Sequence, residues 1–179
     1  IQNSMHTQLK HLLFAAGLAC FTLTAQAQPG TSQTKKTVQA VNPLMKPSTL
    51  PYNAPDFSKI KGDYYLPAIQ AAIAAQRQEI KKITDNKQKP TFANTVLAYE
   101  RSGQMLNRVT GIFFCVTEAD KTPDLEKAEA AVIPMMTNFE NEIKFNQKFF
   151  QRIKYVYDHE LNQLKGEDKK LLEEVYKSF

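Results

Sequence analysis

The chain has 179 residues, of which 42% are hydrophobic and 23% charged, a composition that is ordinary for a soluble globular protein. Its net charge of +5 comes from scattered lysines, whereas a nucleic-acid-binding surface would need a denser basic stripe. We therefore expect no nucleic-acid partner, and we interpret the local run as a solvated helix end. That run consists of Lys81, Lys82, Lys87 and Lys89.

The first 27 residues are interpreted as segments that are absent from the mature protein. Residues 1–4 precede Met5 and are interpreted as extraneous upstream sequence. Residues 5–27 have the three parts of a signal peptide, namely a basic start at Lys10, an apolar stretch over 12–23, and an A-x-A site ending at Ala27. We expect cleavage after Ala27 and a periplasmic or secreted protein. Lipid attachment at Cys20 stays open as an alternative.

Removal of the signal peptide would leave one domain's worth of chain, with Cys115 as its single cysteine. No intrachain disulfide could then form. The apolar stretch is too short to span a bilayer, so we expect no stable membrane insertion after cleavage. Residues 28–61 form an expected extended linker, which we call the leader; it is polar at first and then rich in proline. Apolar residues within it suggest that it lies against a helical body. They are Leu44, Leu50, Tyr52, Phe57 and Ile60.

Residues 62–179 show five helical patterns, of which the first covers 63–84 with Pro67 tolerated in its first turn. Apolar residues recur at helical spacing and predict the buried stripe of each helix. In the first three patterns these are Leu66, Ile69, Ile73, Ile80 and Ile83, then Phe92, Val96, Tyr99, Leu106, Val109, Phe113 and Val116, then Leu125, Ala128, Val132, Met136, Phe139 and Ile143. The second pattern has Thr91 as its N-cap and is predicted to run unbroken to about residue 119. Gly103 and Gly111 lower helix propensity within it, so each is expected to permit close approach of a neighbouring helix.

The third helix is predicted to begin with Thr122 as N-cap and Pro123 at its first position, and Pro134 should bend it. The fourth is predicted over 147–164 and the fifth from about 167 to the last residue. The fourth is expected to turn Phe150, Ile153, Tyr157, Leu161 and Leu164 inward. The uncapped, apolar end of the fifth suggests a chain that was cut. The sequence thus predicts an all-α fold of antiparallel helical hairpins.

The search for a metal site centres on His159, because no other histidine follows the signal peptide. His159 and Glu160 begin a segment one residue away from H-E-x-x-H, in which two histidines four residues apart hold one zinc ion. Here the second histidine is replaced by Gln163, which is a poor zinc ligand. We interpret His159 as an exposed helical residue among charges.

Other candidate residues are interpreted as structural. Cys115 follows two phenylalanines and is predicted to be a buried core thiol. The Met135–Met136 pair fits core packing. Five carboxylates cluster near the start of the third helix, where the helix dipole favours acidic residues. They are Glu118, Asp120, Asp124, Glu126 and Glu129. We therefore expect no catalytic and no metal-binding residue in this chain, and no substrate-binding residue is assigned.

Several motifs nevertheless resemble the peptidyl-dipeptidases, or dipeptidyl carboxypeptidases, of the thimet-oligopeptidase-like zinc metallopeptidases. The resemblance covers about residues 42–179. It is carried by Asn42-Pro43-Leu44, Ser48-Thr49-Leu50-Pro51-Tyr52-Asn53-Ala54-Pro55-Asp56-Phe57-Ser58-Lys59-Ile60, Tyr65-Leu66-Pro67-Ala68, Pro90-Thr91-Phe92-Ala93-Asn94-Thr95, Glu100-Arg101-Ser102-Gly103, Leu106-Asn107-Arg108-Val109, Phe113-Phe114 and Lys170-Leu171-Leu172-Glu173.

The resemblance implies the N-terminal, channel-wall part of a two-lobed helical enzyme that removes C-terminal dipeptides from short peptides. It also implies a zinc cofactor, held by an H-E-x-x-H motif and a later glutamate in a catalytic lobe that this chain does not include. The fragment alone would be inactive, and the missing lobe would be its partner. The alternative is a stand-alone periplasmic helical module that binds peptides or serves as an adaptor without catalysis.

Overall fold

The computed structural model describes residues 41–179, which belong to one compact unit. Residues 1–4, the expected signal peptide over 5–27 and the first part of the leader lie outside the described residues. Within the described part the elements are helices and turns, and no strand is found there. The all-α prediction is therefore confirmed for residues 41–179. No helix among these residues is long and apolar enough to cross a bilayer.

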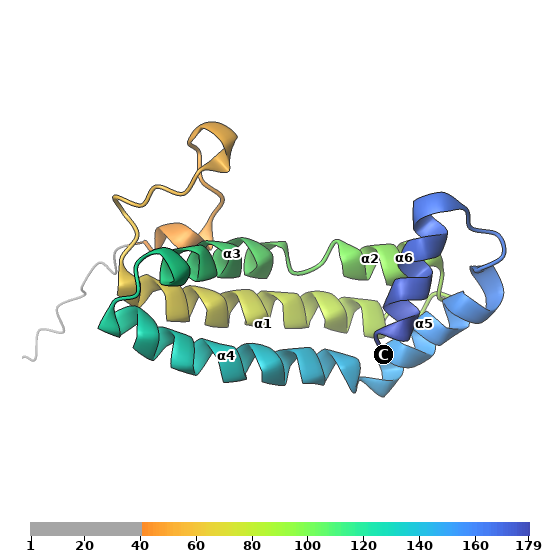
Figure 1. Cartoon of the computed structure of the whole chain (residues 1–179). Helices are drawn as coiled ribbons and strands as arrows, with labels where there is room; N and C mark the ends of the chain where they lie inside the picture. Colours follow the sequence, from red (N-terminus) through yellow and green to blue (C-terminus); the bar gives the residue numbers. More distant parts are fainter. Residues whose placement is uncertain (1–40) are drawn as a thin grey trace, which may run out of the picture. The chain divides into compact units, whose positions relative to one another are not determined.

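Three long helices lie alongside one another. They are α1 (Tyr65–Thr84), α3 (Gln104–Ala119) and α4 (Pro123–Lys144). α1 contacts both α3 and α4 and lies between them in Figure 1. α5 (Gln147–Glu160) and α6 (Gly166–Lys177) pack on each other near the end of α1 that also carries α2 (Leu97–Glu100). Before α1, the leader forms three short 3₁₀ turns: η1 (Pro43–Met45), η2 (Pro51–Asn53) and η3 (Gly62–Tyr64).

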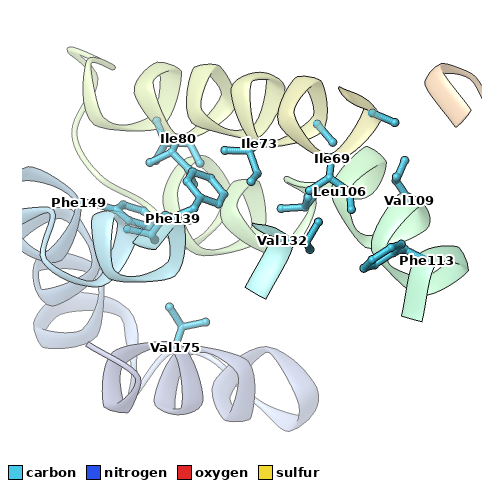
Figure 2. Packing of buried hydrophobic residues seen from close by; sticks show 14 of the residues in the cluster. Ile69, Ile73, Ile80, Leu106, Val109, Phe113, Val132, Phe139, Phe149 and Val175 are labelled. Atoms are coloured by element: carbon cyan, nitrogen blue, oxygen red, sulfur yellow. The ribbon is translucent and has the colours of Figure 1, made fainter. Parts of the chain in front are cut away.

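One apolar core runs through all the long helices. On α1 the buried face follows helical spacing, with Ile69 and Ile73 shielded from solvent beside Ala68 and Ala72. Figure 2 shows residues of this core from α1, α3, α4, α5 and α6; those labelled are Ile69, Ile73 and Ile80 of α1, Leu106, Val109 and Phe113 of α3, Val132 and Phe139 of α4, Phe149 of α5 and Val175 of α6. Because the stripes match the 3.6-residue period, the sequence pattern located most of this core.

Two helix starts confirm the sequence reading. The hydroxyl of Thr122 accepts a hydrogen bond from the backbone N–H of Leu125, and Pro123 is the first residue of α4. Thr91 and Asn94 form a reciprocal capping box at the start of the second pattern. α4 continues through Pro134 to Lys144, and the bend expected there stays a prediction.

The second pattern is not the single helix that the sequence predicted. It begins as a π-helical turn, η4 (Phe92–Val96), continues as α2, breaks at Arg101–Gly103, and resumes as α3. Gly103 has a φ of +71°, which lies in the left-handed region where a side chain is disfavoured. The side chain of Glu79 on α1 accepts a hydrogen bond of 2.7 Å from the Gly103 N–H. The apolar period passes across the break, and for this reason the pattern hid it.

The fourth helix is shorter than predicted, and its buried face matches the prediction only in part: Ile153 is buried, and Tyr157, Leu161 and Leu164 pack against the core, as expected. α5 ends at Glu160, and its buried residues are Phe149, Arg152, Ile153 and Val156. Phe150 and Tyr157, which were expected to be inward, are half-buried and stack on Tyr176 of α6. The helix carries two apolar stripes, one for η4 and α1 and one for α6, and the sequence reading merged them.

The two glycines of the second pattern should respond in opposite ways to alanine. Gly103→Ala should lower the free energy of unfolding by about 1–2 kcal/mol, because φ is positive there and the new Cβ would lie 2.4 Å from the side-chain nitrogen of Gln76. Gly111→Ala should raise it by up to about 1 kcal/mol, because no atom lies within 4 Å and alanine favours helix. Urea unfolding of both variants measures the two changes in the free energy of unfolding, and changes of the same sign and size would contradict the prediction.

Candidate functional site

The leader folds back on the helices and leaves a groove of about 210 Å³ between itself and α3. Leu44 is 3% exposed and packs into the core, where the guanidinium of Arg108 donates a hydrogen bond of 3.1 Å to its carbonyl. The side-chain amide of Asn42 donates a hydrogen bond of 2.7 Å to the carbonyl of Tyr64. The first described residues of the leader are thereby held next to α1 and α3.

Cations outnumber carboxylates along this groove. Lys46, Lys59 and Arg108 line it together with the single carboxylate Asp56. Lys59 and Asp56 form an ion pair of 2.7 Å, and the hydroxyl of Ser58 donates to the same carboxylate. The Lys59 hydrogen bond, followed by that of Ser58, lowers the pKa of Asp56. Apolar residues such as Ile60 and Ile112 form the other wall, so the groove has the character of a binding surface.

The tip of the leader departs from the sequence prediction. Leu44 and Ile60 do pack against the helices, as expected. Leu50, Tyr52 and Phe57 do not, and their exposed fractions are 43%, 100% and 55%. Tyr52 also has a φ of 59°, a left-handed conformation that costs a non-glycine residue about 1–2 kcal/mol. The prediction that the whole apolar strip lies on the helical body is therefore wrong for the segment from Leu50 to Phe57.

A second hollow, of about 440 Å³, lies between the start of α1 and the first turns of α4. Leu66, Pro67, Ala128 and Ala131 give it a mostly apolar lining, and Asp63, Asp124 and Lys127 stand at it as charged groups. It contains no histidine or cysteine.

His159 is exposed, as the sequence predicted. Its ring stacks on Tyr155 with centroids 4.0 Å apart, and its Nδ1 lies 2.8 Å from the Tyr155 carbonyl oxygen. The amide of Gln163 donates a hydrogen bond of 2.9 Å to the backbone carbonyl of His159, so it is engaged with the main chain. Within residues 41–179 no group of three or more histidine, cysteine, aspartate or glutamate side chains is placed to hold a metal ion.

Cys115 is exposed, and the prediction of a buried core thiol is wrong. The buried face of α3 is defined by Leu106, Val109, Phe113 and Thr117. Two residues beyond Phe113 correspond to a rotation of about 200° around the helix, so Cys115 points to the opposite side. The two phenylalanines before it suggested an apolar surrounding, but only the first of them, Phe113, is fully buried.

The remaining charged candidates behave mostly as surface residues. Of the five clustered carboxylates, Glu129 is paired with Lys121 at 3.0 Å. In the lysine run, Lys81 pairs with Asp85, and Lys89 lies over the ring of Tyr155. The methionine pair is half-buried against the core, which confirms the packing interpretation. These two residues are Met135 and Met136.

Sequence reasoning missed a polar cluster centred on Arg152, which is 8% exposed. Its guanidinium donates hydrogen bonds to the carbonyls of Asn86 at 2.8 Å and Gln88 at 3.3 Å, and to the side-chain oxygen of Asn94 at 3.0 Å. Burial lowers the pKa of Arg152. Glu160, two turns further along α5, accepts a hydrogen bond of 2.8 Å from the Phe92 N–H. The sequence did contain one sign of this cluster, because Arg152 occupies a position that the helical spacing places on the buried face of α5.

Replacing Arg152 should destabilise the fold, because its removal takes the donor from three part-buried hydrogen bonds. We expect Arg152→Met to lower the free energy of unfolding by about 2–3 kcal/mol. Lys148→Met on the exposed face of the same helix is the matched control and should change it by less than about 0.5 kcal/mol. Chemical denaturation followed by circular dichroism gives both values. Similar losses for the two variants would argue against the cluster.

The exposed thiol of Cys115 should react in the native state. In a Cys20→Ser background, a chromogenic disulfide reagent should label one thiol without denaturant, and Cys115→Ser should abolish the labelling. Labelling that requires denaturant would restore the buried reading. The test is informative because a core thiol is protected by packing, whereas a thiol on a helix surface is not.

No protein-family profile matches the chain. Two curated proteins do. The chain is 35% identical over 142 residues to the dipeptidyl carboxypeptidase of Salmonella typhimurium strain LT2, and 36% identical over 140 residues to that of Escherichia coli strain K12. Each match covers 78% of this chain but 21% of the relative, so the chain spans about a fifth of these proteins. By sequence similarity the chain therefore resembles part of the dipeptidyl carboxypeptidases, as its motifs predicted.

Proposed function

We propose that this chain is a channel-wall segment of an exported zinc metallopeptidase that removes C-terminal dipeptides from short peptides. The observation that carries the proposal is the identity of 35% and 36% with two dipeptidyl carboxypeptidases over 78% of the chain. The motifs of the leader that resemble the same family agree with this similarity. Export rests on the signal-peptide pattern that ends at Ala27.

The contribution of this segment is structural. α1, α3 and α4 form a layer whose core is shielded from solvent. Two hydrogen bonds tie the leader to it, one from Arg108 to the carbonyl of Leu44 and one from Asn42 to the carbonyl of Tyr64. A wall of this kind holds a peptide by shape and charge, and the basic groove beneath the leader suits extended chains with carboxylate groups. Chemistry on the peptide bond belongs, in this proposal, to the catalytic lobe of the longer protein.

The fit of zinc to the described residues is poor. At the one place where the sequence approaches the zinc motif, the amide of Gln163 is bonded to the backbone of His159 and so does not complete a ligand pair. The two histidines that H-E-x-x-H requires are not supplied here. Zinc, in this proposal, is bound by the H-E-x-x-H motif and the later glutamate that the family resemblance implies in the catalytic lobe.

The second candidate is a peptide-binding module without catalysis. The groove under the leader favours it, because it combines cations with an apolar wall on a segment of one compact unit. A peptide-binding module predicts that the 179-residue chain unfolds cooperatively, is monodisperse and holds peptides by itself. A peptidase segment predicts exposed apolar surface and self-association when it is separated from the rest.

The peptidase proposal is tested on the longer protein that contains this segment. Incubated with an N-acetylated tetrapeptide, it should release the C-terminal dipeptide, as measured by mass spectrometry. A metal chelator should abolish release and added Zn²⁺ should restore it, while the 179-residue chain alone should release nothing. Cleavage that survives chelation, or release of single residues, would contradict the proposal. Cooperative folding and peptide binding by the chain, without cleavage by the longer protein, would favour the second candidate.

A further inference from the structure

Part of the leader between η1 and η3 projects from the helices, as the loop drawn in orange to yellow in Figure 1. It carries three exposed apolar side chains, Leu50, Tyr52 and Phe57, among which Tyr52 is 100% exposed. We call these three residues the leader tip. Isolated exposed apolar residues are common, but three within eight positions on a projecting loop are typical of a contact surface.

The tip is held in one conformation by local bonds. The N–H of Asn53 donates to the carbonyl of Leu50 at 3.0 Å, and the N–H of Ala54 donates to that of Pro51 at 3.1 Å. This turn keeps Tyr52 in the left-handed region at φ 59°, a conformation that asparagine tolerates at the next position but tyrosine does not favour. An exposed aromatic kept in strain by its own turn is pre-organised for a contact outside the described residues.

We propose that the leader tip docks, through Tyr52, into an apolar concavity with a hydrogen-bond acceptor on the remainder of the longer polypeptide. The ring would fill the concavity, and the phenol hydroxyl would donate to the acceptor. The proposal rests on the proposed function for the existence of that remainder. Its length is suggested by the relatives, of which this chain spans 21%.

The small size of the tip favours this occupant over a second copy of the chain. Aromatic side chains bury about 150–250 Å² each, and two of the three tip residues are already half-covered. The tip therefore offers less than the roughly 800 Å² per partner that a stable association of separate molecules needs. A surface of that size suffices when the partner belongs to the same polypeptide, because the effective concentration is then high.

Limited proteolysis within residues 46–60 tests the inference on two proteins, the longer polypeptide and the 179-residue chain. In the longer protein, Tyr52→Ala should speed cleavage of the loop roughly tenfold, because the docked state no longer protects it. In the 179-residue chain the same substitution should leave cleavage and the unfolding midpoint unchanged, because Tyr52 contacts nothing there. Tyr52→Phe should give a smaller acceleration in the longer protein, through loss of the hydroxyl alone.

Phe145→Ala is the matched control, since Phe145 is 76% exposed and lies outside the tip; it should change neither protein. Equal cleavage of wild type and Tyr52→Ala in the longer protein would overturn the inference. So would a raised KM for peptides without faster loop cleavage, which would assign Tyr52 to substrate. Concentration-dependent protection of the 179-residue chain would instead assign the tip to a second copy. Loop protection in a longer protein that cleaves no peptide would preserve the docking and refute the peptidase.

Discussion

The fold depends on the burial of one face of α1. α3, α4, α5 and the first turn of the leader all contact this helix. Its inner face pairs two alanines with two isoleucines, all of them at 4% exposure or less. The alanines keep that face narrow enough for neighbouring helices to approach, and the isoleucines fill the space between them. Because segments far apart in the chain share this surface, the position of the leader, and so of the groove, is set by the packing of α1.

Polar side chains complete the fold where the helices are interrupted. Glu79 receives the N–H of Gly103 at the break before α3, Glu160 receives that of Phe92 at the start of η4, and Arg152 donates to two carbonyls of the loop that follows α1. At helix ends and breaks, some backbone N–H and C=O groups have no hydrogen-bond partner within the helix. Burying such a group without any partner would cost free energy. Each of these ties joins the interrupted region to a continuous helix, which fixes its geometry while the apolar core supplies the driving force.

Helical periodicity predicted what depends on local spacing. It located α1, the buried stripe of α3 and the all-α class, while residue type predicted the cap at Thr122 and the motifs pointed to the peptidyl-dipeptidases. Periodicity failed where two different structures give the same spacing of apolar residues. The stripe continued in phase across Gly103, so the break was invisible, and two stripes on α5 read as one. Cys115 was misplaced because its neighbours in sequence are not its neighbours in space. The roles of Arg152 and of the leader tip depend on contacts over tens of residues, which no local pattern contains.

The bond between Asn42 and Tyr64 gives the leader an unusual property. Because Asn42 and Tyr64 are hydrogen-bonded to each other, the residues between them form a closed loop that is attached to the helices at its base. The entropy of closing such a loop rises only with the logarithm of its length, by about 0.6 kcal/mol for each doubling. Residues between Leu44 and Ile60, which themselves pack against the core, can therefore be inserted, removed or exchanged at little cost to the helical layer. The sequence of this loop, and with it the surface that the loop contacts, can therefore change while the helices that carry it stay the same.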